Sequence, residues 1–379
     1  MLHLVAGKVT DSVTHGFLPA AERLGLQVVL LTDRPADHAK VFGGPIVACD
    51  VKDYREIVAA AEKPTAFFSN SDFLQASTAL AATYFGLPGK DWRAATRAKN
   101  KALMRRHLAS RDPVFAADAE AERVPVEAPF PLVLKPREGV ASEDVFLVHD
   151  ANELAARTKE IRTRRADALV VEEYLPGQLY TLETLGDGRE TRVLGSYLTT
   201  ISPPPHFIEE RLEWAPPPPE TDQIVAQIKA LGIGLGACHT EFVVHDGRAR
   251  IIEVNYRVIG DHCDFLMADL LGIPLFEQIL RVHLGERLPA PTAPPGLHAV
   301  ADVVLAERAG TLTEAPEAME TKDGDVRLAY MPQRATGESF ELTHTNRDYL
   351  GTIRAIGPAK QQVEAAIGRF RAAHSWTIR

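Results

Sequence analysis

Residues 239–257 have the sequence HTEFVVHDGRARIIEVNYR, in which polar and apolar side chains alternate on both sides of a His-Asp-Gly turn. Because successive side chains point to opposite faces of a β-strand, this pattern predicts an antiparallel hairpin with one buried and one polar face. Glu253 and Asn255 share the polar face, and Glu241 and Arg257 extend the set. Two carboxylates, an amide oxygen and a guanidinium suit hard divalent cations that bridge to phosphate, so the hairpin predicts a site that uses ATP.

The apolar pattern also selects the register of this hairpin. A three-residue loop over residues 246–248 places Glu241 opposite Glu253 and Phe242 opposite Ile252. A two-residue Asp-Gly loop would pair Glu241 with Ile252 and put the carboxylates on opposite faces. The first register gathers the apolar side chains on one face, so we expect the three-residue loop. The alternative is an ordinary half-exposed hairpin whose charges face solvent.

Composition narrows the class of protein. The 379 residues suffice for two or three domains, and 45% hydrophobic with 25% charged residues is typical of a soluble globular protein. The formal net charge of −9, without a basic stripe, argues against nucleic acid as a main partner. No apolar run is long enough to span a membrane, and the N-terminus becomes polar too early for a signal peptide. Three scattered cysteines without metal-type spacing predict a reducing cytoplasm.

Residues 1–95 alternate strand-like and helix-like segments. We expect strands at 2–6, 27–32 and 65–69, and helices at 12–24 and 72–85. This alternation predicts an α/β fold, a Rossmann-like parallel sheet with helices on its faces. The first strand is followed by AGKVTDS rather than by GxGxxG, so a dehydrogenase with a dinucleotide site here is disfavoured.

Residues 96–290 are predicted to form a second, α+β domain, and residues 291–379 a C-terminal α/β domain. The expected elements are helices at 98–109, 221–231 and near 359–373, and strands at 131–136, 170–175 and 298–307. The proline-rich stretch 201–220 cannot be regular throughout, so we expect a functional or mobile loop over 201–219. Residues 289–296, PAPTAPPG, are expected to form a linker.

Two lysines and a loop of small residues are candidates for binding phosphate. Lys135 ends a strand and precedes the loop 137–143, which includes Ser142. A lysine in this position can reach a phosphate while backbone amides of the loop close over it. Lys101, on a predicted helix, is a candidate for a second cation. The alternative for both lysines is an ordinary surface position.

The segment VVEEYLPG, residues 170–177, combines apolar, acidic and turn residues. Its backbone and carboxylates can meet the edge of an adenine while its apolar side chains contact the ring faces. Glu183, further along the strand, is expected to point into the same cleft. The alternative is a charged edge strand.

The order of Lys101, VLKP, EEYLPG and EVNYR resembles the ATP-grasp superfamily, over the chain from its first strand to about residue 290. Within the superfamily the chain is most similar to carboxylate–amine ligases related to bacterial amino-acid ligases, including those of siderophore pathways. The resemblance implies an ATP-grasp fold behind the N-terminal Rossmann-like domain. It also implies an ADP-forming carbon–nitrogen ligase that joins a small carboxylate to an amine through an acyl phosphate. The basic side chains of Arg211, Arg257 and His206 could pair with an acidic substrate.

The resemblance assigns roles to individual residues. ATP phosphates would be held by Lys101 and Lys135, with Ser142 in a loop that acts as a lid. The nucleotide contacts would come from Glu172, Glu173, Tyr174, Leu175 and Glu183. Two Mg²⁺ ions, or Mn²⁺ in their place, would be bound by Glu241, Glu253 and Asn255. Arg257 and Lys135 would stabilise the transferring phosphoryl group. Relatives of this kind are often dimers, so a homodimer is one expectation.

The sequence departs from the family pattern at three places, which bear on turnover of the nucleotide and on substrate selection. The loop REGVAS has less glycine than usual, and Leu179 stands where the family often has Glu. VIGDHCD follows Arg257 in place of a glycine pair, so Asp261, His262 and Asp264 are candidates for substrate selection, or else the polar start of a helix. The first two departures leave open a nucleotide-binding regulatory protein that kept the fold without turnover.

Overall fold

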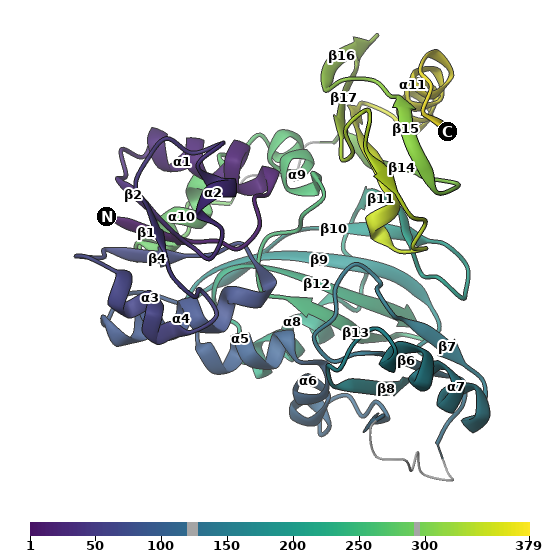
Figure 1. Ribbon diagram of the computed structural model, residues 1–379, viewed down its shortest axis with the longest axis horizontal. Coiled ribbons are helices and arrows are strands. Elements are labelled where there is room, and N and C mark those ends of the chain that lie inside the picture. The colour runs from purple at the N-terminus through teal and green to yellow at the C-terminus, as the bar shows by residue number, and fades with distance from the viewer. Residues whose placement is uncertain (120–127, 292–295) are drawn as a thin grey trace.

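The computed structural model describes residues 1–119, 128–291 and 296–379, and all structural statements concern these residues. Figure 1 shows an N-terminal part, a central part built on a large curved sheet, and a C-terminal part at the other end of that sheet. The predicted linker over residues 289–296 lies partly outside the described residues.

The N-terminal part is a parallel α/β unit, as predicted. Its sheet has the strand order β3-β2-β1-β4, with β1 parallel to both neighbours. The elements are β1 (Leu2–Val5), η1 (Ser12–Phe17), α1 (Leu18–Arg23), β2 (Val28–Thr32), α2 (Pro35–His38), β3 (Ile46–Ala48), α3 (Tyr54–Ala60), β4 (Ala66–Phe68), η2 (Asp72–Leu74) and α4 (Gln75–Tyr84). The short strand β3 has no counterpart in the prediction. The predicted helix at 12–24 begins as the π-helix η1, a form that often occurs at functional sites.

The smaller half of the central part is a four-stranded antiparallel sheet in the order β5-β8-β6-β7. The helices α5 (Trp92–Lys99) and α6 (Lys101–Leu108), whose buried side chains pack on the large sheet, lead into this half. Its own elements are β5 (Ala116–Asp118), β6 (Leu132–Pro136), β7 (Phe146–Val148), α7 (Ala151–Arg162) and β8 (Leu169–Glu173). Leucine, isoleucine and valine side chains of β6, β7, β8 and α7 form its small core. This half lies below the large sheet in Figure 1.

The larger half of the central part shares one nine-stranded sheet with the C-terminal part, in the order β13-β12-β9-β10-β11-β14-β19-β17-β16. Its elements are β9 (Gln178–Asp187), β10 (Thr191–Ile201), β11 (Glu209–Ala215), α8 (Thr221–Ala230), β12 (Leu235–His245), β13 (Arg248–Asn255), α9 (Cys263–Leu271) and α10 (Leu275–His283). The expectation of a loop throughout 201–219 is wrong, because β11 lies within this stretch and pairs with β10 and β14.

The C-terminal part continues the large sheet and covers it with one long helix. Its elements are β14 (His298–Leu305), β15 (Gly310–Glu314), β16 (Met319–Asp323), β17 (Val326–Pro332), β18 (Ser339–Phe340), η3 (Asn346–Asp348), β19 (Tyr349–Gly357), α11 (Lys360–Ala373) and β20 (Thr377–Ile378). The helix α11 buries Val363, Ile367 and Phe370 in a core shared with β17 and β19. The strands β15, β18 and β20 form a separate small sheet.

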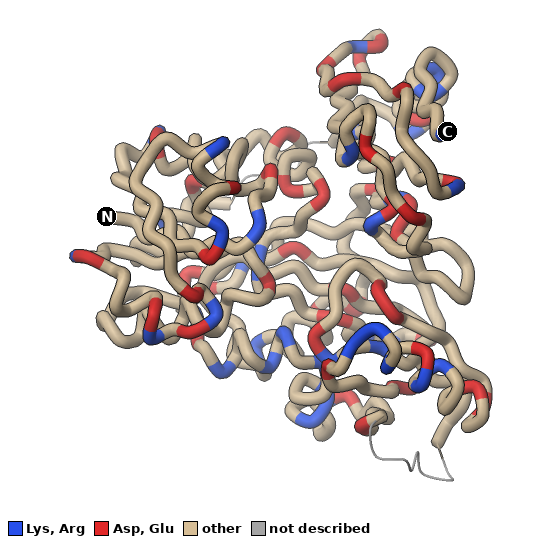
Figure 2. The backbone as a smooth tube through the Cα atoms, viewed as in Figure 1, with Lys and Arg blue, Asp and Glu red and all other residues tan. Residues whose placement is uncertain are grey.

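Helices from the central part pack against the N-terminal part and fix the two together. Phe276 of α10 meets Phe17 edge to face at a ring distance of 5.0 Å. Gly16 permits this approach, since a Cβ there would lie 2.4 Å from the Phe276 ring. One buried cluster therefore runs from β1 through α1 to α9 and α10, and it joins segments more than two hundred residues apart. Charged residues of both signs are interspersed over all three parts (Figure 2).

Candidate functional site

The hairpin β12–β13 brings Glu241 directly opposite Glu253, as predicted. The predicted three-residue loop is wrong. The turn has two residues, Asp246 and Gly247, which both have positive φ, and His245 pairs with Arg248. The register changes between Glu241 and Phe242, where two residues of β13 oppose one of β12. This β-bulge compensates for the shorter turn and restores the carboxylate pair.

The extra residue of the bulge is Ile252, which the sequence pattern had placed in the core opposite Phe242. In the structure Phe242 pairs with Ile251, and both are fully buried. Ile252 instead lines a cavity together with Val243. The bulge thus gives this cavity an apolar floor next to the two carboxylates.

Lys101 reaches Glu253 because the predicted helix 98–109 is broken at Asn100. That residue has extended backbone angles, and its side-chain oxygen accepts a hydrogen bond from the Leu103 N–H at 3.1 Å. The cap starts α6 in a new direction. The Lys101 ammonium lies 2.9 Å from Glu253 Oε1 and 3.3 Å from the Gly139 carbonyl. One buried cation therefore connects a predicted metal ligand to the predicted phosphate loop.

Lys135 belongs to a buried ionic triad with Glu172 and Arg105. Lys135 Nζ is 2.6 Å from Glu172 Oε2, and Arg105 Nε is 2.9 Å from Glu172 Oε1. Burial opposes ionisation of Glu172, but the two cations outweigh it and lower its pKa to about 2. The triad ties β6, β8 and α6 together at the wall of the same cavity. The Glu172 carboxylate is thus bound by protein cations.

His239 connects Glu183 to the carboxylate pair. His239 is opposite Glu183 across β12 and β9, and its Nδ1 lies 2.7 Å from Glu183 Oε1. Its Nε2 is 3.5 Å from Glu241 Oε1, and Asn255 Nδ2 donates to the same oxygen at 3.3 Å. Burial alone would lower the pKa of His239, but the adjacent Glu183 and Glu241 raise it to about 10. Glu183 is therefore placed behind Glu241 and lines neither of the two cavities described next.

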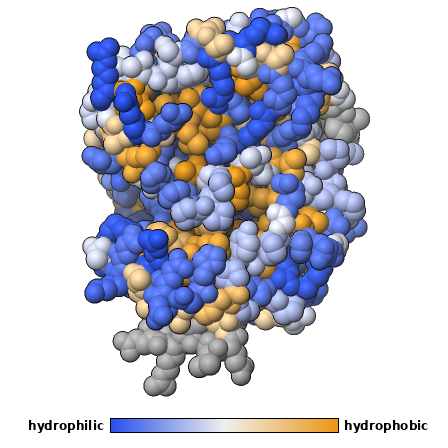
Figure 3. All heavy atoms as spheres, turned by 90° about the vertical axis from the view of Figure 1, so that its right-hand side faces the viewer, coloured by the Kyte–Doolittle hydropathy of each residue, from blue (hydrophilic) through white to orange (hydrophobic). Residues whose placement is uncertain are grey.

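Two cavities meet at the carboxylate pair. The smaller, of about 190 Å³, lies between the antiparallel sheet and the large sheet, and its lining includes Lys101, Lys135, Glu173, Tyr174 and Leu175. The larger, of about 460 Å³, extends toward the C-terminal part and includes Asn255 and Arg257. The residues shared by both are Val140, Ala141, Glu209, Glu241, Glu253 and Asn346. Figure 3 shows the side of the molecule that is on the right in Figure 1, and hydrophobic side chains are visible in the recess across its middle.

The loop 137–143 closes over the junction of these cavities and is held from three sides. Ala141 and Ser142 have φ of 57°, the left-handed region that glycine normally occupies. Ser142 Oγ donates to the Phe207 carbonyl at 2.9 Å, and the Ala141 carbonyl accepts from the Asn346 N–H at 3.1 Å. Glu143 of the loop forms an ion pair with Arg347. Contacts with the rest of the protein thus support a conformation that the sequence REGVAS does not favour by itself.

Arg257 faces the larger cavity and is anchored to the N-terminal part. Its Nε donates to Asp72 Oδ2 at 3.0 Å, and its Nη1 donates to the Val258 carbonyl at 2.8 Å. Arg257 also borders a third cavity of about 800 Å³. That cavity lies at the carboxyl ends of β1, β2 and β4, where ligands bind in open parallel sheets.

The residues after Arg257 divide between two roles. His262 Nε2 is 2.9 Å from Asp11 Oδ2, and Asp264 Oδ2 accepts from Ser12 Oγ at 2.6 Å. These contacts tie the start of α9 to the π-helix η1 and support the structural alternative for His262 and Asp264, and His262 also lines the third cavity. Asp261 differs, because it is exposed and lines both larger cavities. It keeps its place as a candidate for substrate selection.

Lys90 is a buried cation that fixes the end of the hairpin. Its ammonium donates to Gln75 Oε1 at 2.6 Å and to the Tyr256 carbonyl, and it lies 4.4 Å from the centre of the Tyr256 ring. Gln75 in turn donates to the carbonyls of Ser69 and Ser71. Burial lowers the pKa of Lys90 to about 7.

Replacing Lys90 by methionine is expected to change how stability depends on pH. Lysine in the unfolded chain has its ordinary pKa of 10.5, so between about pH 7 and that value the unfolded state binds more protons than the folded state. Wild-type stability therefore gains with rising pH across this window, whereas methionine does not titrate. Urea denaturation at several pH values should show the free energy of unfolding of wild type rising relative to K90M. A difference independent of pH would contradict the lowered pKa.

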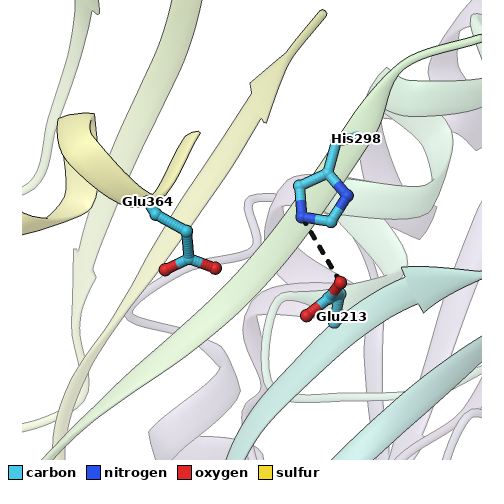
Figure 4. Close-up of side chains that lie close together, drawn as sticks. All are labelled: Glu213, His298 and Glu364. Carbon is cyan, nitrogen blue, oxygen red and sulfur yellow. Dashed lines mark ion pairs between the residues drawn. The ribbon is translucent and has the colours of Figure 1, made fainter. Parts of the chain in front are cut away.

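A separate group of potential metal ligands lies where β11, β14 and α11 meet. Glu213, His298 and Glu364 offer ligand atoms within 4.8 Å of one another (Figure 4). Both carboxylates already have basic partners, since Lys360 Nζ donates to Glu213 at 2.7 Å and Arg211 pairs with Glu364. The group is an ion-pair network that joins the central and C-terminal parts. Arg211, expected above to bind an acidic substrate, is engaged in it.

The sequence prediction missed Glu209 and Asn346, which line both cavities, and Arg105 and His239, which each line one of them. Arg105 lies four positions after Lys101, and His239 lies two before Glu241, so helix and strand periodicity could have found both. Glu209 and Asn346 come from β11 and η3, far apart in the chain. No local pattern connects them.

Comparison with known proteins identifies the central part. Residues 128–265 match the family model described as the ATP-grasp domain. The structure superposes on an L-amino acid ligase from Bacillus licheniformis with a TM-score of 0.82 and 20% identity, covering 100% of this chain and 98% of the other. Residues 128–265 therefore form an ATP-grasp domain, and the whole chain has the same fold as that ligase. This confirms the fold and the resemblance inferred from the sequence motifs.

Two further proteins are similar to this chain over most of its length. The chain is 27% identical over 406 residues to an uncharacterized protein of Sinorhizobium fredii, y4rH, covering 98% of this chain and 82% of that protein. The biotin carboxylase domain of Hydrogenobacter thermophilus 2-oxoglutarate carboxylase, solved with MgADP and bicarbonate, has a TM-score of 0.73 and 18% identity over 100% of this chain and 90% of that one. Among the described residues, no helix is both long enough and apolar enough to cross a membrane.

Proposed function

We propose that this protein is an ATP-dependent carbon–nitrogen ligase that joins a small carboxylate to an amine and releases ADP and phosphate. The observation that carries the proposal is the junction of the two cavities. Glu241 and Glu253 line both cavities, Lys101 lies on the nucleotide side, and Arg257 lies on the substrate side. Oxygen ligands between two cationic groups suit the transfer of a phosphoryl group from one cavity to the other.

In this proposal ATP occupies the smaller cavity with its adenine at the β8–β9 connection. The N–H groups of Glu173 and Tyr174 already donate to the Phe115 and Pro131 carbonyls. The Leu175 N–H then remains as the donor for the adenine edge. The Glu172 carboxylate is held by Lys135 and Arg105, so its part is to position Lys135 against the phosphates.

Glu241, Glu253 and Asn255 would hold Mg²⁺. Their donors are carboxylate and amide oxygens on adjacent strands, the kind that hard divalent cations prefer, and Asn255 Nδ2 lies 3.3 Å from Glu241 Oε1. The bound metal would offset the negative charge of the phosphate groups. Two ions, and Mn²⁺ as a substitute, belong to the same proposal. The relative from Hydrogenobacter thermophilus was solved with a magnesium salt of ADP.

The carboxylate substrate would bind in the larger cavity beside Arg257. Its oxygen attacks the γ-phosphorus, the bond to the β-phosphate oxygen breaks, and ADP leaves. The acyl phosphate that results is then attacked by the amine, and phosphate is released. Arg257 and Lys135 offset the charge of the transferring group, while the closed loop 137–143 keeps water away from the acyl phosphate.

The name of the relative from Bacillus licheniformis suggests amino acids as the first substrates to examine. A role in dipeptide or siderophore formation belongs to this proposal, and the exposed Asp261 is its candidate for substrate selection. A cytoplasmic location and a homodimer are further proposals. Sedimentation of the purified protein measures the oligomeric state.

Phosphate release with a substrate panel tests the function. The panel combines ATP and Mg²⁺ with the proteinogenic amino acids and citrate as carboxylates, and with the same amino acids, putrescine and hydroxylamine as amines. We expect phosphate and ADP in equal amounts, and the matching amide or hydroxamate by mass spectrometry, for at least one pair. Tight ATP binding without turnover for any pair would instead favour a regulatory protein of the same fold.

A further inference from the structure

Glu209 occupies the junction of the two cavities without a role so far. It begins β11 and lines both cavities together with Glu241 and Glu253. A β-bulge places it there: Ile201 pairs with Glu209 and Thr200 with Arg211, so Glu210 is the extra residue. Bulges next to functional sites re-aim side chains, as the bulge at Ile252 does on β13.

The backbone and side chain of Glu209 are both held by the C-terminal part. The Glu209 N–H donates to Asn346 Oδ1 at 3.1 Å, and Asn346 Nδ2 donates to Glu209 Oε2 at 3.2 Å. The Tyr349 hydroxyl donates to the Glu209 carbonyl at 2.8 Å. Within the described residues, the other carboxylate oxygen, Oε1, makes no hydrogen bond and is not enclosed, so it is open to a ligand in the cavities.

Glu209 also differs from the other carboxylates of the junction in its charge environment. Lys101 lies beside Glu253, and His239 lies beside Glu241. Across the part of the chain that the structure describes, Glu209 forms no ion pair. A half-buried carboxylate without an ion-pair partner in the protein either takes up a proton or is stabilised by a ligand that brings a positive group to it. An alkylammonium is the cation that the second half of the proposed reaction supplies.

We propose that Glu209 receives the attacking amine through its free carboxylate oxygen and takes a proton from it. This inference rests on the ligase function proposed above and adds a binding and catalytic residue for the amine. Asn346 is a positioning residue in this scheme, because it fixes Glu209 through both of its hydrogen bonds.

The step balances in protons and charge. The substrate ammonium gives one proton to Glu209 and becomes a neutral amine, whose nitrogen attacks the acyl carbon. The carbon–nitrogen bond forms and the bond between carbon and the phosphate oxygen breaks. The second proton leaves nitrogen with the departing phosphate, which becomes hydrogen phosphate. The products are one amide, one hydrogen phosphate and a protonated Glu209 that returns its proton to solvent.

The test compares two nucleophiles in Glu209→Gln. Glutamine keeps an oxygen that accepts from Asn346, but it binds an ammonium weakly and cannot take its proton. With the amino acid or putrescine that the wild type uses best, we expect phosphate release to fall about a hundredfold. Hydroxylamine is uncharged at neutral pH and needs no such step, so hydroxamate formation should stay close to wild type. Hydroxamate formation by E209Q also shows that the site of this variant is correctly folded.

Glu210→Gln is the matched control, since Glu210 is the next residue of β11 and lines neither cavity. It should behave as wild type with both nucleophiles. Three results would overturn the proposal: equal losses of E209Q with both nucleophiles, no loss with either, or a raised Mg²⁺ requirement with both, which would make Glu209 a metal ligand. Failure of wild type in the whole panel would instead refute the ligase function itself.

Discussion

Replacing Glu253 by alanine is expected to lower ATP turnover on the order of a thousandfold while the protein stays folded. Glu253 is opposite Glu241 in the hairpin and accepts from Lys101 at 2.9 Å, so its loss removes a proposed metal ligand and releases the lysine beside it. A loss of about 4 kcal/mol in transition-state stabilisation corresponds to that factor. Asn255→Ala should act in the same direction. Release of ADP under saturating substrates measures the effect.

Stability and a surface carboxylate provide the controls for this experiment. Removal of Glu253 leaves the buried Lys101 without its ion-pair partner, so thermal denaturation should show a lower midpoint but still one cooperative unfolding transition. Glu307→Ala changes an exposed carboxylate of the C-terminal part and should leave turnover unchanged. ADP release at the wild-type rate in either E253A or N255A would refute the metal assignment.

The hairpin shows how far a local pattern determines a site. Alternation predicted the polar face and the pairing of Glu241 with Glu253, because both depend only on the period of a strand. The pattern could not reveal that a two-residue turn is offset by a bulge at Ile252. Two errors of one residue cancel in the position of the carboxylates, but they move Ile252 from the core to the cavity. The shorter turn and the bulge occur together, and the sequence of one strand does not predict either of them.

The parts of the site that come from distant segments lay beyond sequence reasoning. Prolines in 201–220 weaken any local expectation of a strand, yet β11 forms because β10 and β14 both offer edges to it. Glu209 meets Asn346 across 137 positions of the chain. The motifs proposed Lys101 and Lys135 as candidates, whereas the arrangement between the cavities depends on which strands are neighbours in the nine-stranded sheet.

Removing the central carboxylate of the buried triad is expected to be the most destabilising single change near the site. Glu172→Ala leaves Lys135 and Arg105 buried and close together without a counter-charge. Loss of one partner from a buried ion pair costs about 3–5 kcal/mol. Urea denaturation at neutral pH should show this fall in the free energy of unfolding. Glu172→Gln should lose less, since its oxygen still accepts from one of the cations.

Acid pH supplies the specific signature of the triad. The ordinary pKa of Glu172 is 4.5 and its folded pKa is about 2, so its ionisation stabilises the folded state above about pH 4.5 and this contribution is lost as the pH falls toward 2. The difference between wild type and E172A should therefore shrink across that window. Glu173→Ala is the control, because its ion pair with Arg250 leaves 23% and 22% of the two side chains exposed and, being better screened than the triad, should contribute only about 1 kcal/mol. If E172A and E173A cost the same, the triad does not hold β6, β8 and α6 together. If E172A alone is costly, Glu172 is the counter-charge that keeps the two buried cations together and Lys135 in place.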